Sequence, residues 1–285
     1  MILRSLLFVP ADSERKIVKG LEGDADALIL DLEDSVAPAR KAAAREIVRE
    51  VTGDKTLFVR VNPLDGGWIE KDLAAALACR PFGIVLPKAN HGDDVAALDA
   101  LLGVAEARAG IEDGTTRILP IVTETAAGTL ATSTYAGVSN RLWGLTWGAE
   151  DLATSIGALA KRYPDGRYRD AFRFARGLAL LGAVAAKVEP VDTVFPDFRD
   201  ADGFARECED AATDGFTAKM AIHPAQVEAV NAAFTPSEEA IGEAKAVIEA
   251  FAVAGDPGVV VLDGRMLDRP HLLAAQRVLA RIGTN

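Results

Sequence analysis

The sequence predicts a (β/α)8 barrel with a C-terminal extension. Short apolar runs alternate with longer segments of helical period, and the alternation occurs eight times along the chain. Continuous apolar strands between helices are typical of a parallel sheet covered on both faces, and eight such units close a barrel. Ionisable residues also follow many of the apolar runs, at the edge where barrels carry their sites. A doubly wound open sheet is the main alternative.

The predicted strands are short apolar runs, for example SLLFV and GIVLP. We expect them at 5–9, 27–30, 56–61, 83–87, 117–122, 141–147, 192–195 and 219–222. The longer segments between them have helical period. We expect these helices at 13–21, 40–51, 69–78, 94–109, 125–133, 150–159, 169–182, 200–213 and 224–233. Residues 1–233 are therefore predicted to form the catalytic barrel.

The pattern changes after residue 233. A helix is expected at about 237–252, with Ser237 as its N-cap and Glu239 in its first turn, where an acid favours the helix dipole. A short hairpin around Asp263 and Gly264 and a final helix should follow. Because this segment does not fit a ninth barrel unit, residues 234–285 are predicted to form a C-terminal helical extension or lid.

Composition excludes several kinds of partner. The 285 residues are 49% hydrophobic, which is ample for a large core, and the net charge of −11 argues against a nucleic-acid partner. No apolar run approaches the roughly 18 residues of a membrane span, and the N-terminus lacks the pattern of a signal peptide. Cys79 and Cys208 lie far apart without a CxxC motif, so we expect reduced thiols in a cytoplasmic protein and no zinc site.

Charged and polar residues stand at the predicted C-terminal ends of the strands, where barrel chemistry occurs. They are Asp12, Asp31, Glu33, Asp34, Arg60, Asn62, Lys88, Glu124, Glu150, Asp151, Asp197 and His223. Some also have structural explanations as helix caps, first-turn acids or turn residues, namely Asp34, Glu124, Glu150 and His223. Lys88 could reach solvent from its strand end. Arg60 is harder to explain, because a charge inside an apolar strand needs an anionic partner or a ligand.

The acids suit a divalent cation. Magnesium prefers oxygen ligands and usually takes only one or two protein carboxylates beside substrate oxygens and waters. Glu124 and Asp151, from neighbouring strands, are the predicted ligands, and Glu33 and Asp34 are expected to hold metal-bound waters. Arg60 would bind an anionic substrate. Without a shell of histidines, zinc or iron fits poorly.

Nine segments, in order, resemble one known family. They are RSLLFVPADSERK, ALILDLEDSV, FVRVN, IVLPKA, TET, WGAEDL, VFPDFRD, AKMAIHPAQV and VVVLDGRMLDRPH. The chain resembles the citrate lyase beta subunit-like proteins of the HpcH/HpaI aldolase superfamily, which include malyl-CoA and citramalyl-CoA lyases. The resemblance covers nearly the whole chain. It implies a (β/α)8 barrel, usually assembled as a homotrimer or hexamer, and a carbon–carbon lyase that uses Mg²⁺, with Mn²⁺ as a substitute.

The resemblance also implies roles for individual residues. Glu124 and Asp151 match the family's metal ligands, and Arg60 matches its substrate-carboxylate arginine. Asp268 matches the catalytic acid/base, which in this family reaches a neighbouring subunit's site. From the residues alone, Asp268 would be a helix cap. Lys88 would give the substrate electrostatic support.

A CoA site is implied in the same way. Phe8, Arg15 and Lys19 match positions that contact the CoA nucleotide, and Ile222 and His223 match a segment beside the CoA arm. Arg15 and Lys19 lie four residues apart and share a helix face, which suits phosphates or a solvated surface equally well. The family often has Tyr where Phe8 stands, so one polar contact to CoA could be weaker here.

The predicted reaction cleaves a 3-hydroxy-3-carboxyacyl-CoA of the malyl or citramalyl type into acetyl-CoA and a 2-oxo acid, or runs the reverse condensation. Arg60 would hold the substrate carboxylate, and Asp268 would protonate the acetyl-thioester enolate. Glu33 and Asp34 complete the predicted catalytic set. Three alternatives stay open: a citrate lyase beta subunit acting on a citryl-acyl-carrier protein, a CoA-independent 2-oxo acid aldolase, and a non-catalytic dicarboxylate-binding subunit.

Overall fold

Eight parallel strands form the centre of the protein in the computed structural model, which describes residues 2–255 and 257–282. The strands are β1 (Ser5–Pro10), β2 (Ala27–Asp31), β3 (Thr56–Arg60), β4 (Gly83–Leu86), β5 (Arg117–Pro120), β6 (Gly144–Thr146), β7 (Glu189–Asp192) and β8 (Ala218–Ala221). They are hydrogen-bonded in the order β5-β4-β3-β2-β1-β8-β7-β6. Every neighbouring pair in this order is parallel.

Backbone hydrogen bonds between β5 and the β6 segment close the sheet into a barrel. The N–H of Ile118 donates to the Arg141 carbonyl at 2.8 Å, and the N–H of Trp143 donates to Ile118 at 2.9 Å. Further along, the N–H of Val122 donates to Thr146 at 2.9 Å. The predicted (β/α)8 barrel is therefore confirmed, and the open-sheet alternative is wrong.

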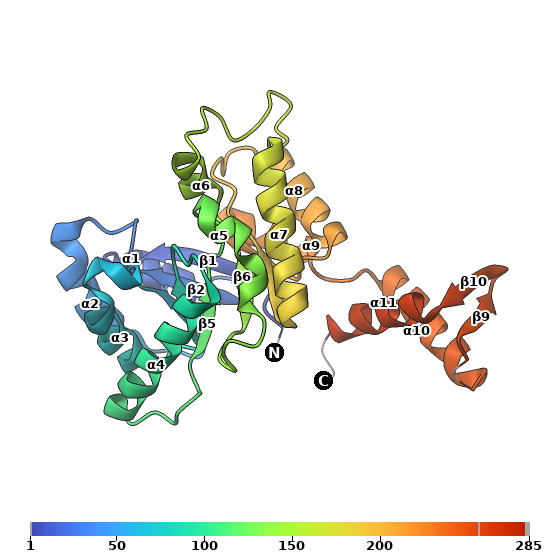
Figure 1. Ribbon diagram of the computed structural model, residues 1–285, viewed down its shortest axis with the longest axis horizontal. Helices are drawn as coiled ribbons and strands as arrows, with labels where there is room; N and C mark the ends of the chain where they lie inside the picture. The colour runs from blue at the N-terminus through green and yellow to red at the C-terminus, as the bar shows by residue number, and fades with distance from the viewer. Residues whose placement is uncertain (1, 256, 283–285) are drawn as a thin grey trace.

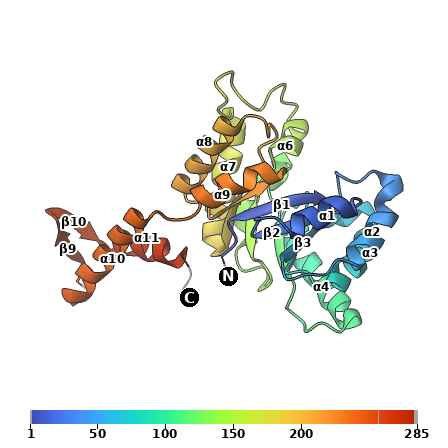
Figure 2. The same ribbon diagram turned by 180° about the vertical axis from the view of Figure 1, so that it is seen from behind.

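Helices surround the barrel, as Figures 1 and 2 show from opposite sides. They are α1 (Glu14–Leu21), α2 (Lys41–Arg49), α3 (Ile69–Ala76), α4 (Gly92–Ala109), α5 (Ala126–Leu130), α6 (Ala149–Ser155), α7 (Asp170–Ala186), α8 (Ala201–Asp214) and α9 (Val227–Ala233). Alternation along each strand divides the core. Leu7 and Leu28 pack outward against the helices, whereas Leu6 and Ile29 belong to the cluster inside the barrel.

Strand β7 lies earlier than predicted. The sequence predicts it at 192–195, but it spans Glu189–Asp192 and begins with a charged residue and a proline. An apolar run alone does not mark this strand, because its pairing with β6 and β8 fixes the position. Asp192 therefore ends the strand, fully buried, and Asp197 lies in the exposed loop beyond it.

The extension comprises α10 (Glu238–Val253), a hairpin of β9 (Val259–Leu262) and β10 (Arg265–Asp268), and α11 (Arg269–Ala280). Ser237 caps α10 through the Ala240 N–H, and Asp263 and Gly264 form the predicted turn with positive φ angles of 51° and 76°. The extension has a small core of its own: Phe251, Val260, Leu267 and Leu272. Figure 1 shows it projecting away from the barrel.

Two further sequence predictions bear on the whole chain. Cys79 and Cys208 are both free thiols, as expected. The division into residues 1–233 and 234–285 stays a prediction, and residues 1, 256 and 283–285 of those ranges lie outside the described part of the chain. In that described part, no helix is both long enough and apolar enough to cross a membrane.

Candidate active site

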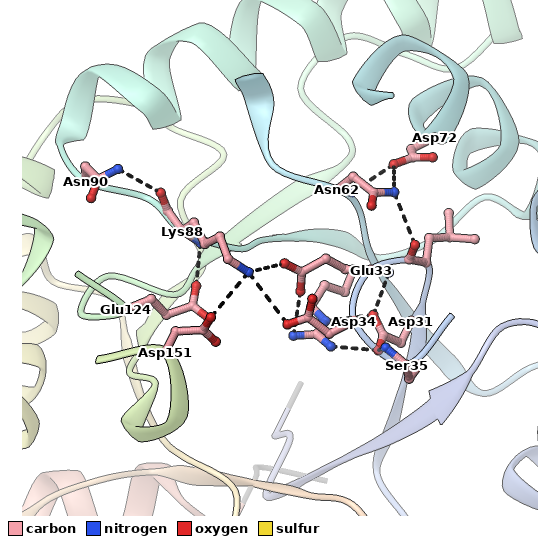
Figure 3. A network of polar contacts seen from close by, with 12 residues as sticks. Asp31, Glu33, Asp34, Ser35, Asn62, Asp72, Lys88, Asn90, Glu124 and Asp151 are labelled. Carbon is pink, nitrogen blue, oxygen red and sulfur yellow. Dashed lines mark hydrogen bonds and ion pairs between the residues drawn. The ribbon is translucent and has the colours of Figure 1, made fainter. Parts of the chain in front are cut away.

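Charged side chains from neighbouring strands meet at the C-terminal mouth of the barrel (Figure 3). They come from the loop after β2, from the end of β3, from the loops after β4 and β5, and from the first turn of α6. The residues are Asp31, Glu33, Asp34, Arg60, Lys88, Glu124 and Asp151. All of them are residues that the sequence placed at strand ends.

Arg60 is held by two of these acids. Its Nε and Nη2 donate to the two oxygens of Asp31 at 2.7 and 2.6 Å, and its Nη1 lies 2.9 Å from Glu33 Oε2. The guanidinium carbon also lies 4.9 Å from the centre of the Phe8 ring. Burial raises the pKa of Asp31, but the bonds from Arg60 outweigh it and hold that pKa below its ordinary value. The arginine inside the apolar strand thus has an anionic partner.

Lys88 connects the acids of β2 with those of β5 and α6. Its ammonium forms an ion pair with Glu33 and lies 3.6 Å from both Asp34 and Asp151. Its backbone N–H donates to the Glu124 carboxylate. The residue has a φ of 54°, in the left-handed region that non-glycine residues rarely adopt. Lys88 therefore has a more central position than the sequence indicated.

Glu124 is almost completely buried, with 3% of its surface exposed. Burial raises its pKa to about 8, which the Lys88 N–H opposes and the neighbouring Asp151 and Glu33 carboxylates reinforce. Gly148, before α6, allows this arrangement because a Cβ there would lie 2.7 Å from the Glu124 Cγ. Burial disfavours the ionised form of this carboxylate, and a bound cation would stabilise that form.

The residues fit magnesium better than a metal that needs many protein ligands. Among the described residues, no group of three or more His, Cys, Asp and Glu side chains could hold a metal ion. Glu124 and Asp151 point toward the same space in Figure 3 and supply oxygen atoms only. Magnesium needs no more than one or two protein carboxylates, because waters and substrate oxygens complete its shell. This donor set also excludes a typical zinc site.

Some of the residues at the strand ends have other partners. Glu150 forms an ion pair with Lys161, and Asp12 lies 3.6 Å from Arg40. Asp197 accepts the N–H of Arg199 at 3.2 Å. These three acids therefore do not join the cluster at the barrel mouth.

Asn62 belongs to a buried cluster behind the loop after β2, and the sequence does not predict its partners Lys41 and Asp72. The ammonium of Lys41 donates to the carbonyls of Leu32 and Glu33 at 2.8 and 3.0 Å, and to Asn62 at 2.6 Å. Asn62 in turn donates to Asp72 at 2.7 Å. The cluster fixes the backbone that carries Glu33. Its signal in the sequence is a lysine at the start of a helix, where the dipole disfavours a cation.

The residues assigned to CoA lie in two separate places. Arg15 and Lys19 are exposed on α1, and Lys19 lines a groove of about 1000 Å³ between α1 and α9. Phe8, by contrast, packs with the cluster inside the barrel, beside Arg60. His223 closes the turn before α9, since its Nδ1 accepts the Ala225 N–H at 3.2 Å.

The segment around His223 is accessible from outside. The His223 ring stacks on Phe198, with centroids 4.7 Å apart. The neighbouring Ile222 is 39% exposed. A planar ligand group could therefore reach this edge of the barrel.

Asp268 caps α11 and lies in the extension. Its carboxylate is 2.5 Å from the Nδ1 of His271, and its side chain is about half exposed. Figures 1 and 2 both show the hairpin that carries it on the far side of the extension from the barrel. The structure therefore does not bring Asp268 to the site of its own chain.

Comparison with known proteins shows which family the chain resembles. A family model described as HpcH/HpaI aldolase/citrate lyase matches residues 4–224, and one described as C-C bond lyase of the TIM-barrel fold matches residues 171–283. The citrate lyase subunit beta of Leuconostoc mesenteroides subsp. cremoris is 34% identical over 99% of this chain and 94% of its own length. A (3S)-malyl-CoA thioesterase of Cereibacter sphaeroides is 36% identical over 98% of this chain and 94% of its own.

A solved structure is similar over the same extent. The crystal structure of the protein CitE from Mycobacterium tuberculosis, in complex with magnesium, acetoacetate and coenzyme A, superposes with a TM-score of 0.81. It is 33% identical and covers 99% of both chains. The likeness therefore includes the barrel and the extension.

Proposed function

This chain belongs to the HpcH/HpaI aldolase/citrate lyase family of carbon–carbon lyases, and we propose that it is a Mg²⁺-dependent lyase of CoA thioesters. Its substrate would be a 3-hydroxy-3-carboxyacyl-CoA of the malyl or citramalyl type, cleaved to acetyl-CoA and a 2-oxo acid. The observation that carries the proposal is the buried Glu124 carboxylate beside Asp151, with Arg60 at the end of β3, two strands away from β5 in the sheet. The two acids can bind a cation, and the arginine can bind a substrate carboxylate beside it.

Glu124 and Asp151 would hold the metal. When bound, Mg²⁺ would supply Lewis-acid stabilisation of negative charge on the substrate oxygens. Arg60 would bind the substrate carboxylate through its Nη1, which makes no bond to Asp31 and lies 2.9 Å from Glu33. Glu33 and Asp34 would accept hydrogen bonds from waters around the metal. Lys88 would contact the same substrate oxygens as electrostatic support.

Asp268 would act as the general acid. Cleavage would move the electron pair of the carbon–carbon bond onto the α-carbon of the acetyl thioester, while the substrate hydroxyl gives its proton to solvent water and its carbon becomes the carbonyl of the 2-oxo acid. The Asp268 carboxyl group would donate its proton to that α-carbon and release acetyl-CoA. In the condensing direction, its carboxylate would remove a methyl proton.

Asp268 would have to come from a second copy of the chain. Its hairpin lies away from its own barrel and exposes apolar side chains, namely Val259, Val261 and Met266 at 49%, 71% and 72%. Such a surface is typical of one that packs against another subunit. A homotrimer or hexamer, in which each extension covers a neighbouring barrel, is consistent with this geometry.

CoA would approach along α1. Arg15 and Lys19 would bind its phosphates, Ile222 and His223 would border its arm, and Phe8 would lie at the barrel mouth near the thioester end. The groove lined by Lys19 runs from this helix toward the segment after β8. The CitE complex with coenzyme A supports a CoA ligand. We also propose a cytoplasmic location, where CoA esters and reduced thiols occur.

Two other substrates or outcomes have specific support. The citrate lyase subunit beta of Leuconostoc suggests a citryl-acyl-carrier-protein substrate. The malyl-CoA thioesterase of Cereibacter suggests hydrolysis of the thioester in place of carbon–carbon cleavage. The products distinguish these possibilities, because hydrolysis gives free CoA and malate, whereas cleavage gives acetyl-CoA and a 2-oxo acid.

The purified protein should be incubated with malyl-CoA and with citramalyl-CoA, with and without Mg²⁺, and the products followed by mass spectrometry. We expect Mg²⁺-dependent release of acetyl-CoA with glyoxylate or pyruvate. Free CoA with intact malate would favour the thioesterase. If folded protein with bound Mg²⁺ releases nothing from either ester, the carrier-protein thioester or a dicarboxylate-binding role becomes the better proposal.

A further inference from the structure

We propose that the Lys88 ammonium is an internal counter-cation that a divalent metal ion must displace from Asp151 before the site can work. This inference rests on the proposed function, because it concerns the same metal site. Lys88 thereby has a further role. Its charge holds the acids of the metal-free enzyme together and determines how tightly the metal ion binds.

The geometry of Lys88 supports this role. Its Nζ forms an ion pair with Glu33 and lies 3.6 Å from Asp151 Oδ1 and 3.6 Å from Asp34 Oδ2. Figure 3 shows the ammonium between these three carboxylates. A metal ion bound to Asp151 would lie about 2 Å from its oxygen. Two cations would then share one carboxylate, and their repulsion would favour movement of the one that can move.

The backbone of Lys88 is the fixed part of this arrangement. Its N–H donates to Glu124, and its carbonyl accepts the Asn90 side-chain N–H at 3.1 Å. The left-handed φ of 54° aims the main chain at Glu124 while the side chain reaches across to Glu33. One residue therefore contacts acids on both sides of the site, and only its side chain is free to change partners.

The Lys88 side chain can move away from Asp151 while it keeps its ion pair with Glu33. It is 33% exposed, and its four-carbon stem can swing without disturbing the backbone bond to Glu124. Glu33, with its side chain 4% exposed, would retain the ammonium, while Asp151 would be released to the metal. The displaced charge would then face the substrate oxygens. The same lysine thus weakens metal binding and supports substrate binding.

Removing the Lys88 charge should tighten metal binding. Mg²⁺ affinity of the full-length protein would be measured by isothermal titration calorimetry for the wild type, Lys88→Met and Lys161→Met. Lys161 is the matched control, because it pairs with Glu150, the neighbour of Asp151, and lies outside the cluster. We expect Lys88→Met to bind Mg²⁺ about tenfold more tightly and Lys161→Met to stay within about twofold of the wild type.

Metal-free stability gives a second readout. Lys88→Met should have a lower Tm than the wild type without metal, and Mg²⁺ should raise its Tm by more than it raises that of the wild type. If Lys88→Met does not fold, Lys88→Gln is measured in its place. Unchanged or weaker Mg²⁺ affinity in the folded variant, or an equal gain in Lys161→Met, would overturn the inference. Failure of the wild type to bind Mg²⁺ would instead overturn the proposed function.

Discussion

Arg60 illustrates how individual residues prepare this site. A guanidinium in an apolar strand is tolerated because Asp31 binds it through two hydrogen bonds and Glu33 lies beside it. Asp31 is itself fixed, since it accepts the backbone N–H groups of Glu33 and Ser35 at 2.9 and 3.1 Å. The three acids within the run LILDLEDSV are therefore paired with the cations Arg60 and Lys88 before any ligand arrives. The Arg60 side chain keeps 13% of its surface exposed, whereas that of Glu33 keeps only 4%.

Gly148 should be essential for the position of Glu124. We expect Gly148→Ala to weaken Mg²⁺ binding by about tenfold or more, because a Cβ 2.7 Å from the Glu124 Cγ would push that carboxylate aside. Calorimetric titration with Mg²⁺ measures the change. Gly177→Ala is the control, since a Cβ on α7 at that position meets nothing within 4 Å. Equal Mg²⁺ affinity in Gly148→Ala and wild type would show that Glu124 does not bind the metal.

Asp268 should affect turnover and leave oxo-acid binding unchanged. We expect Asp268→Asn to lower kcat by at least about a hundredfold, because the amide cannot donate the proton that the enolate needs. Oxaloacetate or pyruvate should still bind to the Mg²⁺-loaded protein with an affinity close to that of the wild type, measured by calorimetry. Loss of oxo-acid binding in the variant would contradict the role of a general acid.

At the scale of the elements, a buried ion cluster joins β7 and β8 to the helices outside them. The Lys219 ammonium, which is fully buried, donates to Asp192 at 2.9 Å and to Glu207 on α8 at 3.0 Å. Arg176 on α7 donates to Asp192 at 3.1 Å, and the Trp147 ring N–H donates to it at 2.7 Å. The cluster lies among the apolar side chains between the barrel and these helices, with Arg176 over the Phe216 ring and Lys219 over the Phe204 ring.

The Asp192 cluster should make the protein sensitive to acid. Burial raises the pKa of Asp192, but the charges of Lys219 and Arg176 outweigh it and hold that pKa at about 2. Because this lies below the ordinary value of 3.8, the stabilisation is present above about pH 4 and is lost as the pH falls toward 2. Urea unfolding from pH 6 to pH 2.5 measures it as a falling free energy of unfolding.

Asp192→Asn is the matched variant for this measurement. It should be less stable at pH 6 by about 3–5 kcal/mol, because Lys219 would lose a charged partner in a buried place. Its free energy of unfolding should also fall less steeply between pH 4 and 2.5, since one titrating group is gone. Parallel pH profiles for the two proteins would show that other carboxylates govern acid unfolding.

The strands show which parts of the fold can be predicted from the sequence and which cannot. Seven of the strands could be found because a buried parallel strand is a continuous apolar run. β7 was misplaced because Glu189 and Pro190 begin it, and only pairing with β6 and β8 makes them a strand. Strand ends could indicate Glu33, Arg60 and Glu124. They could not show which acid faces which cation, because that depends on side chains of different strands.

The whole molecule places Asp268 away from the barrel that it follows in sequence. The extension has its own core and exposes an apolar hairpin, which lies on the far side of the extension from the barrel (Figures 1 and 2), and Asp268 ends the second strand of that hairpin. A site built from one copy would therefore lack the proposed proton donor, Asp268. Local sequence patterns do not show which residues meet across two subunits. Only the resemblance to the family therefore predicts a shared site.

Two inactive variants should restore activity to one another if the site is shared. Glu124→Gln removes the metal ligand from the barrel, and Asp268→Asn removes the acid from the extension, so each assembly alone should be inactive. In co-expressed mixed assemblies, some sites combine an intact barrel from one copy with an intact extension from its neighbour. For random assembly at equal amounts, about a quarter of the sites meet both conditions, and we expect about a quarter of wild-type turnover. Mixing the purified variants without subunit exchange is the control and should stay inactive. If co-expression gives no activity although mixed assemblies form, Asp268 does not act on a neighbouring barrel, and the extension would have to fold back onto its own.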